Sequence, residues 1–288
     1  MAQRSAGGIG ALSRTAIAVA LLLAPACGSR GGKHGGQAAP KVLRVGSDIE
    51  YAPIEFYQEN GQEPQGLDVD LANALGAKLG MTVTFVNDTD FAGIIGALRA
   101  GRFDVVMSAM NDTAERRGKG VDFVDYFRAG SSILVQKGNP RSVKGLDDLC
   151  GATVAVQKGT TQDTDILTAQ ESKCRTAGRP VTVLRFEKDI DALQQVKNGR
   201  AVADLEDFPV AAYNAATSGG GNDFDVVPTQ VGDVGVYGIA VPADNAALRD
   251  RLRDALRAAI DDGTYDRILA RWNISAGALK TAAVNGAS

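Results

Sequence analysis

Segments typical of β-strands alternate with segments typical of helices along most of this chain, and this alternation restricts the fold more than any other feature. In the first half, β-branched and aromatic residues favour strands, and apolar residues at helical spacing favour the helices between them. The predicted elements are strands at Val42–Gly46, Thr82–Val86 and Phe103–Ser108 and helices at Asp68–Leu79 and Phe91–Leu98. Two consecutive strand–helix–strand crossovers imply a parallel sheet.

A second set of strands and helices begins after Asn139 and Pro140. It contains predicted strands at Thr153–Val156, Val181–Leu184, Ala201–Leu205 and Val236–Val241, and predicted helices at Ile190–Lys197, Ala246–Ile260 and Tyr265–Trp272. The part expected to fold runs from about residue 41 to residue 285. Because single domains typically have about 50–200 residues, the sequence predicts two α/β lobes.

A polar turn follows the predicted strand Phe103–Ser108 and supplies Asn111 and Arg116. Ligands of open α/β sheets bind in the crevice beyond the carboxyl ends of the strands. The planar fork of an arginine matches the two oxygens of a carboxylate. We therefore expect a carboxylate site around Arg116. The alternative is a solvated arginine on a turn, beside Arg117.

Residues 1–26 have the pattern of an export signal. Arg4 and Arg14 supply positive charge, and the apolar core from Ala16 to Ala24 is far shorter than the roughly 20 residues of a membrane-spanning helix. The segment ending in Ala26 and Cys27 is similar to a bacterial lipoprotein cleavage box. We expect Cys27 to be lipidated and to anchor the protein to the outer face of the cell membrane. The alternative is an ordinary secretory peptide cleaved near Ala26.

Residues 27–40 are rich in glycine and show no apolar periodicity, so we expect the lipidated cysteine to be followed by a flexible tether. The only histidine of the chain, His34, lies in this tether. Catalysis or metal binding by histidine is therefore not expected in the folded part, and we expect no cofactor and no metal.

The remaining cysteines, Cys150 and Cys174, form one pair. An exported location permits disulfides, so we expect these two residues to be joined. The alternatives are two reduced thiols or half of a metal site.

The chain has 31 basic and 34 acidic residues and a formal net charge of −3. A mildly acidic chain without a basic stripe is not expected to bind nucleic acid.

Eight segments, in order, resemble the bacterial extracellular solute-binding proteins that supply polar amino acids to ABC importers. They are GSDIEYAPIEF, GLDVDLANALGAKLG, FAGIIGALRAGRFDVVMSAMNDTAER, VDFVDYF, VAVQKGTTQD, NGRAVADLEDFPVAAY, YGIAV and DGTYDRILARW. The resemblance covers nearly all of residues 41–274. It implies the type II periplasmic-binding-protein-like α/β fold, with two lobes joined by a two-strand hinge. Lobe 1 would comprise residues 41–129 and 235–288, and lobe 2 would comprise residues 130–234.

The resemblance also implies how the two poles of an amino acid are held. Arg116 would bind the α-carboxylate, with help from Asn111, Ser108 and Ala109. Thr161 of the other lobe would donate to the same carboxylate, and Asp207 would accept the α-ammonium. From the residues alone, Thr161 could equally cap a helix, and Asp207 could be an N-cap before Pro209.

Further positions would line the pocket for the ligand side chain. By the resemblance these are Asp48, Tyr51, Phe91 and Gln162. Phe91 could instead belong to the core, and Tyr51 could anchor a loop. The resemblance favours a basic or polar amino acid, although Lys158 could equally meet an acidic or amide side chain.

The sequence therefore predicts a monomeric binding lipoprotein that delivers a free polar amino acid, with a preference for basic ones, to the membrane permease of an ABC importer. It is not expected to be an enzyme. The alternative function is that of a cyclohexadienyl or arogenate dehydratase, which shares this fold, with Glu55 as the only evident general acid.

Overall fold

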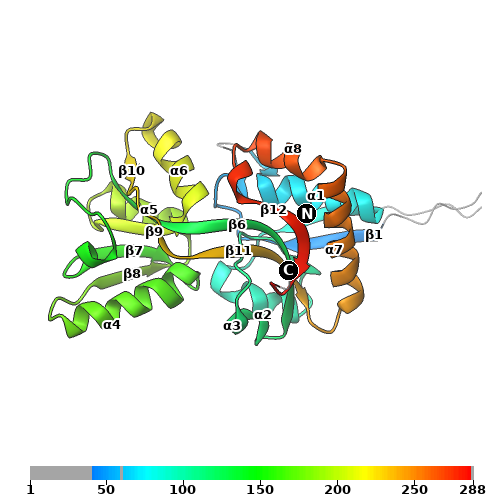
Figure 1. Cartoon of the computed structure of the whole chain (residues 1–288), viewed down its shortest axis with the longest axis horizontal. Helices are drawn as coiled ribbons and strands as arrows, with labels where there is room; N and C mark the ends of the chain where they lie inside the picture. The colour runs from blue at the N-terminus through cyan, green and yellow to red at the C-terminus, as the bar shows by residue number, and fades with distance from the viewer. Residues whose placement is uncertain (1–40, 59–60, 287–288) are drawn as a thin grey trace, which may run out of the picture. The chain divides into compact units, whose positions relative to one another are not determined.

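The computed structural model describes residues 41–58 and 61–286, and it contains two α/β lobes (Figure 1). The expected export signal, the expected lipidation site Cys27 and the tether lie outside the described residues. Among the residues that are described, no helix combines the length and apolar character needed to cross a membrane.

The first lobe contains the predicted parallel sheet. Strand β1 (Lys41–Gly46) lies between β4 (Met81–Val86) and β5 (Val105–Val106) and is parallel to both. The connections are α1 (Leu67–Leu79) and the pair η1 (Phe91–Gly93) and α2 (Ile94–Arg99). Both predicted crossovers are confirmed.

Strand β5 is shorter than the predicted strand at 103–108. The N–H groups of Asp104 and Met107 still donate to the carbonyls of Arg44 and Gly46 in β1, at 2.9 and 3.1 Å. The pairing thus extends past both ends of β5, and the chain that follows it leaves at the carboxyl end of the sheet.

The second lobe repeats this plan. Strand β7 (Thr153–Gln157) lies between β8 (Thr182–Phe186) and β9 (Ala203–Asp207), parallel to both. Its other elements are a π-helix at Gln162–Leu167 and then α4 (Thr168–Thr176), α5 (Asp189–Lys197), α6 (Phe208–Thr217) and β10 (Phe224–Val226). Strand β9 begins and ends two residues later than predicted, and its last residue is therefore Asp207.

Two long antiparallel strands pass through both lobes (Figure 1). They are β6 (Val121–Gln136) and β11 (Val231–Pro242), and through them the strands of both lobes join in one ten-stranded sheet. The predicted lobe boundaries fall within these strands, at Ala129 and its register partner Gly235. A Cβ atom on Gly235 would lie 2.3 Å from Oδ1 of Asn111, so glycine permits the close approach of β11 to the loop that contains Asn111.

The C-terminal segment returns to the first lobe. Helices α7 (Ala246–Asp261) and α8 (Thr264–Arg271) pack against α1, and strand β12 (Ala278–Val284) pairs with β6. The sequence predicted both helices but not β12, whose alanine-rich sequence has a weak strand propensity. Its pairing with β6 is a tertiary interaction.

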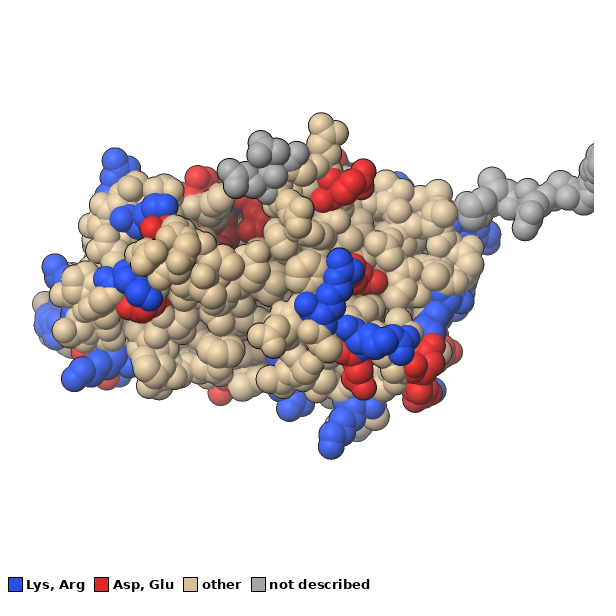
Figure 2. Space-filling view, turned by 90° about the horizontal axis from the view of Figure 1, so that it is seen from above, with Lys and Arg blue, Asp and Glu red and all other residues tan. Residues whose placement is uncertain are grey.

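Each lobe has its own apolar core. Leu43, Leu71 and Tyr265 belong to the first, and Ile133, Val154 and Leu205 belong to the second. Acidic and basic side chains intermingle on the face shown in Figure 2.

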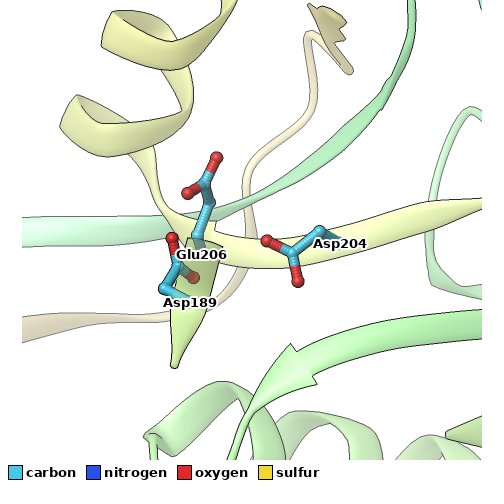
Figure 3. A group of neighbouring side chains, drawn as sticks. All are labelled: Asp189, Asp204 and Glu206. Carbon is cyan, nitrogen blue, oxygen red and sulfur yellow. The ribbon is translucent and has the colours of Figure 1, made fainter. Parts of the chain in front are cut away.

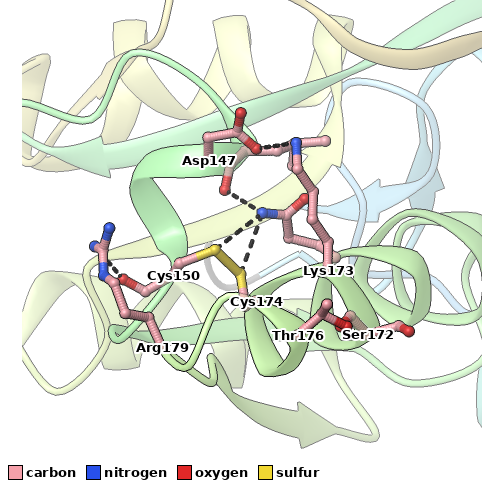
Figure 4. The surroundings of a disulfide bond; sticks show 9 residues. Asp147, Cys150, Ser172, Lys173, Cys174, Thr176 and Arg179 are labelled. Atoms are coloured by element: carbon pink, nitrogen blue, oxygen red, sulfur yellow. Dashed lines mark hydrogen bonds and ion pairs between the residues drawn. A yellow bond between two sulfur atoms is a disulfide. The ribbon is translucent and has the colours of Figure 1, made fainter.

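Cys150 and Cys174 are joined by the predicted disulfide, in the second lobe (Figure 4). The bridge ties the segment before β7 to α4, and the Gln170 side-chain amide donates to Sγ of Cys174 at 3.2 Å. Because both cysteines are buried, the bridge is part of the core of this lobe.

Replacing both cysteines by alanine should lower the free energy of unfolding by about 3 kcal/mol, because the bridge closes a loop and restricts the unfolded chain. The two residues are 24 positions apart. Urea denaturation of the oxidised protein and of the double variant measures this difference. Equal midpoints, or two free thiols in the exported protein, would contradict the prediction.

Candidate functional site

The loops at the strand ends of the two lobes line one cavity between them. All ten residues that the sequence analysis assigned to ligand binding line this cavity. They are Asp48, Tyr51, Phe91, Ser108, Ala109, Asn111, Arg116, Thr161, Gln162 and Asp207. Glu55, Gln157 and Thr160 also line it. The tertiary structure thus brings together side chains that lie up to 159 positions apart.

Arg116 lies on the one-turn helix α3 (Ala114–Arg117), which Thr113 caps by accepting the Arg116 N–H. The side chain is buried, so the solvent-exposed alternative is wrong for Arg116. Its guanidinium donates to the carbonyl of Asn111 at 2.9 Å and to the carbonyl of Gly159 at 3.0 Å. Burial lowers its pKa to about 10, so the group is still a cation at neutral pH.

Phe91 lies beneath this cation, with the centre of its ring 5.2 Å from the guanidinium carbon of Arg116. The ring faces the cavity on one side and belongs to an apolar cluster with Ile94 and Leu98 on the other. Phe91 therefore belongs to the apolar core and also lines the cavity. The ring gives the buried cation a favourable contact that leaves its hydrogen-bond donors free.

Asp207, the last residue of β9, lies across the cavity in the other lobe. It occupies the N-cap position of α6, but its side chain makes no capping bond there. Instead it accepts a hydrogen bond from the Gln162 amide at 2.9 Å and one from the Tyr51 hydroxyl at 3.4 Å. Burial raises the pKa of Asp207 to about 6, against the opposing effect of these donors and of Tyr237. At pH 7 and above the site therefore presents a carboxylate.

Asp48 forms a second acidic position in the first lobe. One carboxylate oxygen accepts the Phe91 N–H at 3.2 Å and the Gln157 amide at 2.9 Å. The other oxygen is paired with Lys188, which also lies 3.2 Å from Glu50. Burial raises the pKa of Asp48, and the lysine opposes that rise. The sequence analysis missed Lys188, because only the packing of the lobes brings it to Asp48.

Asn111 and Thr161 meet between the lobes, where the Asn111 amide donates to the Thr161 hydroxyl at 2.9 Å. The Oδ1 atom of Asn111 is buried and has no hydrogen-bond partner among the described residues. Several other contacts also join the lobes here, including those of Arg116 with Gly159 and of Tyr51 with Asp207. The cavity is therefore walled by both lobes.

Ser108 and Ala109 line the cavity but use their donors elsewhere. The Ser108 hydroxyl donates to Glu55 at 3.0 Å and accepts the Asp48 N–H at 3.0 Å. Ala109 adopts a left-handed backbone with φ of 46°, and its N–H donates to the buried carboxylate of Asp68 at 3.0 Å. These two residues thus shape the wall and hold the loop, while the donors of Arg116 and Asn111 are the ones at the cavity.

Glu55 is a buried acid in the same wall. Burial, and then the nearby charge of Asp68, raise its pKa well above the usual value. By contrast Lys158, which the sequence left as a possible ligand contact, pairs with Glu187 at 2.9 Å and does not line the cavity.

Residues 43–275 match the family of bacterial extracellular solute-binding proteins, family 3. The chain belongs to this family. The predicted fold class is therefore correct, and family 3 members are extracellular solute-binding proteins.

Relatives of this family 3 protein bind amino acids. It is 32% identical over 248 residues to an arginine-binding protein, ArgT, of Corynebacterium glutamicum, covering 85% of this chain and 78% of that one. It also resembles the structure of an ancestral arginine-binding protein bound to arginine. That match has a TM-score of 0.72 and 38% identity and covers 80% of this chain and 97% of the other.

A third similar structure relates to the alternative function. It is an ancestral amino-acid-binding protein described as a precursor of cyclohexadienyl dehydratase, with 38% identity and a TM-score of 0.67, covering 80% of this chain and 95% of that one. The proteins similar to this chain thus include arginine-binding proteins and an amino-acid-binding protein that is described as the precursor of an enzyme.

The ligand-free protein should be more stable at pH 5 than at pH 8. Burial raises the pKa of Asp207 to about 6 and the pKa values of Asp68, Asp125 and Asp189 to about 7. In the unfolded chain an aspartate has a pKa of about 3.9, so at intermediate pH the folded chain binds protons that the unfolded chain releases. This stabilisation is full below about pH 4 and is lost as the pH rises through about 6 and 7.

Thermal unfolding between pH 5 and pH 8 measures this trend. The variant Asp207→Asn should show a shallower decline between pH 5 and pH 7, because one of the titrating groups is gone. A Tm that is constant or rises over the same range would contradict the assignment.

Proposed function

We propose that this protein binds a free polar amino acid, preferably a basic one, in the cavity between its lobes and delivers it to the permease of an ABC importer. One observation carries the proposal: a buried guanidinium, Arg116, and a buried carboxylate, Asp207, line the same cavity from different lobes. An α-amino acid is a small zwitterion, and each of its charges loses hydration in a cleft. It therefore requires a partner of opposite sign for each charge.

The carboxylate of the amino acid would lie at Arg116. The guanidinium donates only to neutral carbonyls, so its positive charge is not paired in an ion pair with any of the described acids. The Asn111 amide and the Thr161 hydroxyl are adjacent and supply further donors. An arriving carboxylate would accept hydrogen bonds from these groups, and its bonds to the guanidinium would join two opposite charges.

The ammonium group would lie at Asp207. Gln162 and Tyr51 orient this carboxylate and leave it as the acceptor of the second lobe. Because the two poles contact different lobes, the ligand gains most when the lobes are together. Closure is then a population shift driven by that difference in affinity. We place the boundaries of the moving lobes at Ala129 and Gly235, within the hinge strands β6 and β11.

Replacing Arg116 by alanine should weaken amino-acid binding by at least about 30-fold, because truncating one partner of a desolvated charge pair costs about 2–5 kcal/mol. Calorimetric titration with L-arginine measures the loss. The matched control is Arg117→Ala, which removes a neighbouring arginine that pairs with Asp112 at 2.6 Å and does not line the cavity. Unchanged affinity in the Arg116 variant, or an equal loss in the Arg117 variant, would reject the carboxylate role.

The preference for a basic side chain rests on Asp48. This carboxylate lines the cavity, and its partner is a lysine from the other lobe, Lys188. The similar proteins support the same preference, since two of them are arginine-binding proteins. A cationic ligand side chain would compete with Lys188 for Asp48.

Replacing Lys188 by alanine should therefore raise the affinity for L-arginine relative to L-glutamine by about tenfold, because coupling between close charges at interfaces is at least about 1.5 kcal/mol. Parallel calorimetric titrations give this ratio and cancel any general effect on closure. Lys158→Ala is the control, as it removes an exposed lysine of the same lobe. A ratio that is unchanged or falls would show that the ligand side chain does not reach Asp48.

We further propose that the protein is exported and attached by a lipid on Cys27 to the outer face of the cell membrane, where it would act as a monomer. The pattern of residues 1–27 supports this proposal. Mass spectrometry of Cys27 in the membrane fraction tests the attachment directly.

A dehydratase is the second candidate function, and Glu55 is the observation that favours it. This carboxyl group lines the cavity, and burial raises its pKa well above the usual value, which is the direction that a general acid toward a substrate hydroxyl requires. Incubation with arogenate or prephenate separates the two functions: product formation would favour the enzyme, and saturable binding without product would favour transport.

A further inference from the structure

Three acidic side chains meet inside the second lobe, outside the cavity described above. They are Asp189 at the start of α5 and Asp204 and Glu206 in β9 (Figure 3). One carboxylate oxygen of each lies within 4.8 Å of the others. All three residues are at most 3% exposed, and none forms an ion pair with a lysine or arginine of the described chain. None of them lines the amino-acid cavity.

Asp204 is the least satisfied of the three. It is fully buried, and neither of its carboxylate oxygens has a hydrogen-bond partner among the described residues. Its register partners are Leu134 on β6 and Ala155 on β7, so the sheet offers it only apolar neighbours on both sides. Figure 3 shows its carboxylate on the side of Asp189 and Glu206. A carboxylate in this position requires a partner that the described chain does not supply.

A fourth oxygen lies beside the cluster, and it comes from a different strand. Ser132 of β6 is the register partner of Glu206, and directly paired residues project from the same face of a sheet. Ser132 is fully buried, and its hydroxyl also lacks a partner among the described residues. Glu206 uses one oxygen to accept the Asn214 amide at 3.0 Å, and its other oxygen is unpartnered. Oxygens without hydrogen-bond partners, from Ser132 on β6 and from Asp204 and Glu206 on β9, thus lie on the same face of the sheet.

We propose that Asp189, Asp204 and Glu206, with Ser132, form a binding site for a hard divalent cation in lobe 2, with Ca²⁺ as the ion that fits best. Hard cations prefer oxygen ligands, and Ca²⁺ accepts carboxylates in irregular geometry at about 2.3–2.6 Å. Two ligands on opposite sides of the ion can then be about 5 Å apart, which accommodates the observed spacing. Mg²⁺ is less suitable, because it demands an octahedron and retains water.

The cation would fix the wall of the amino-acid cavity. Glu206 immediately precedes Asp207, and Asp189 immediately follows Lys188, so the cluster joins the two segments that supply these cavity contacts. A bound ion would hold the end of β9 against the start of α5. Its role is structural and does not depend on which amino acid, if any, the cavity accepts.

The test uses the full chain, stripped with EDTA and titrated with CaCl₂ at pH 7.5 in the absence of amino acids. We expect one saturable binding event with a dissociation constant on the order of 10⁻⁴ M, typical of weak extracellular calcium sites. In 10 mM CaCl₂ the Tm should rise by about 4 °C or more. No saturable heat and no rise in Tm up to 10 mM would overturn the proposal, whether or not the protein binds an amino acid.

Two variants and a control locate the site. Asp204→Asn should abolish the calcium heat and the rise in Tm while leaving the EDTA-treated protein at least as stable as the wild type, because a buried unpaired acid is removed. Glu206→Gln should do the same and serves if the first variant does not fold. Asp191→Asn, at an exposed acid of the same helix α5, should retain both effects. Retention of calcium binding in Asp204→Asn and Glu206→Gln would overturn the assignment.

Discussion

The cavity is built around a buried cation, the guanidinium of Arg116, which forms no ion pair with an acid of the described chain. Arg116 is buried, and its guanidinium contacts the carbonyls of Asn111 and Gly159 and the ring of Phe91. These partners are neutral, so they offset part of the lost hydration without neutralising the charge. Because Gly159 belongs to the second lobe, the full set exists only when the lobes meet. In the function proposed above, the same residue would link recognition of an anion to the position of the lobes.

The sheet makes this arrangement possible. Strands β6 and β11 pass through both lobes, and the parallel strands of each lobe end near the cavity, as expected for ligand sites in open α/β sheets. Asp207 shows the consequence of exact strand position. It is the last residue of β9 and the neighbour in sequence of Glu206, yet the pleat sends the two side chains to opposite faces. One acid reaches the cavity, and the other joins the acidic cluster.

Several buried acids lie around this site, and they differ in the hydrogen-bond donors and cations that surround them. Asp207 and Asp48 have amide donors and a nearby cation, whereas Asp204 has no partner among the described residues. Donors stabilise the charged form of a carboxyl group, and burial without donors favours the protonated form or a bound cation. The lobes thus contain acids suited to an ammonium group and a cluster suited to a metal ion.

The sequence by itself determined the α/β lobes, the order of most strands and helices, and the cysteine pair, because strand and helix periodicity and residue type are local properties. Resemblance to a family also placed ten residues that the structure gathers around one cavity. Only the tertiary structure decided the pairing of β12 and the ion pair of Lys188 with Asp48. It also decided that Ser108 and Ala109 donate to the buried acids Glu55 and Asp68, and that Asp189 meets Asp204 and Glu206. These features depend on strand register and on contacts between distant segments, and no local pattern specifies which side chains such contacts bring together.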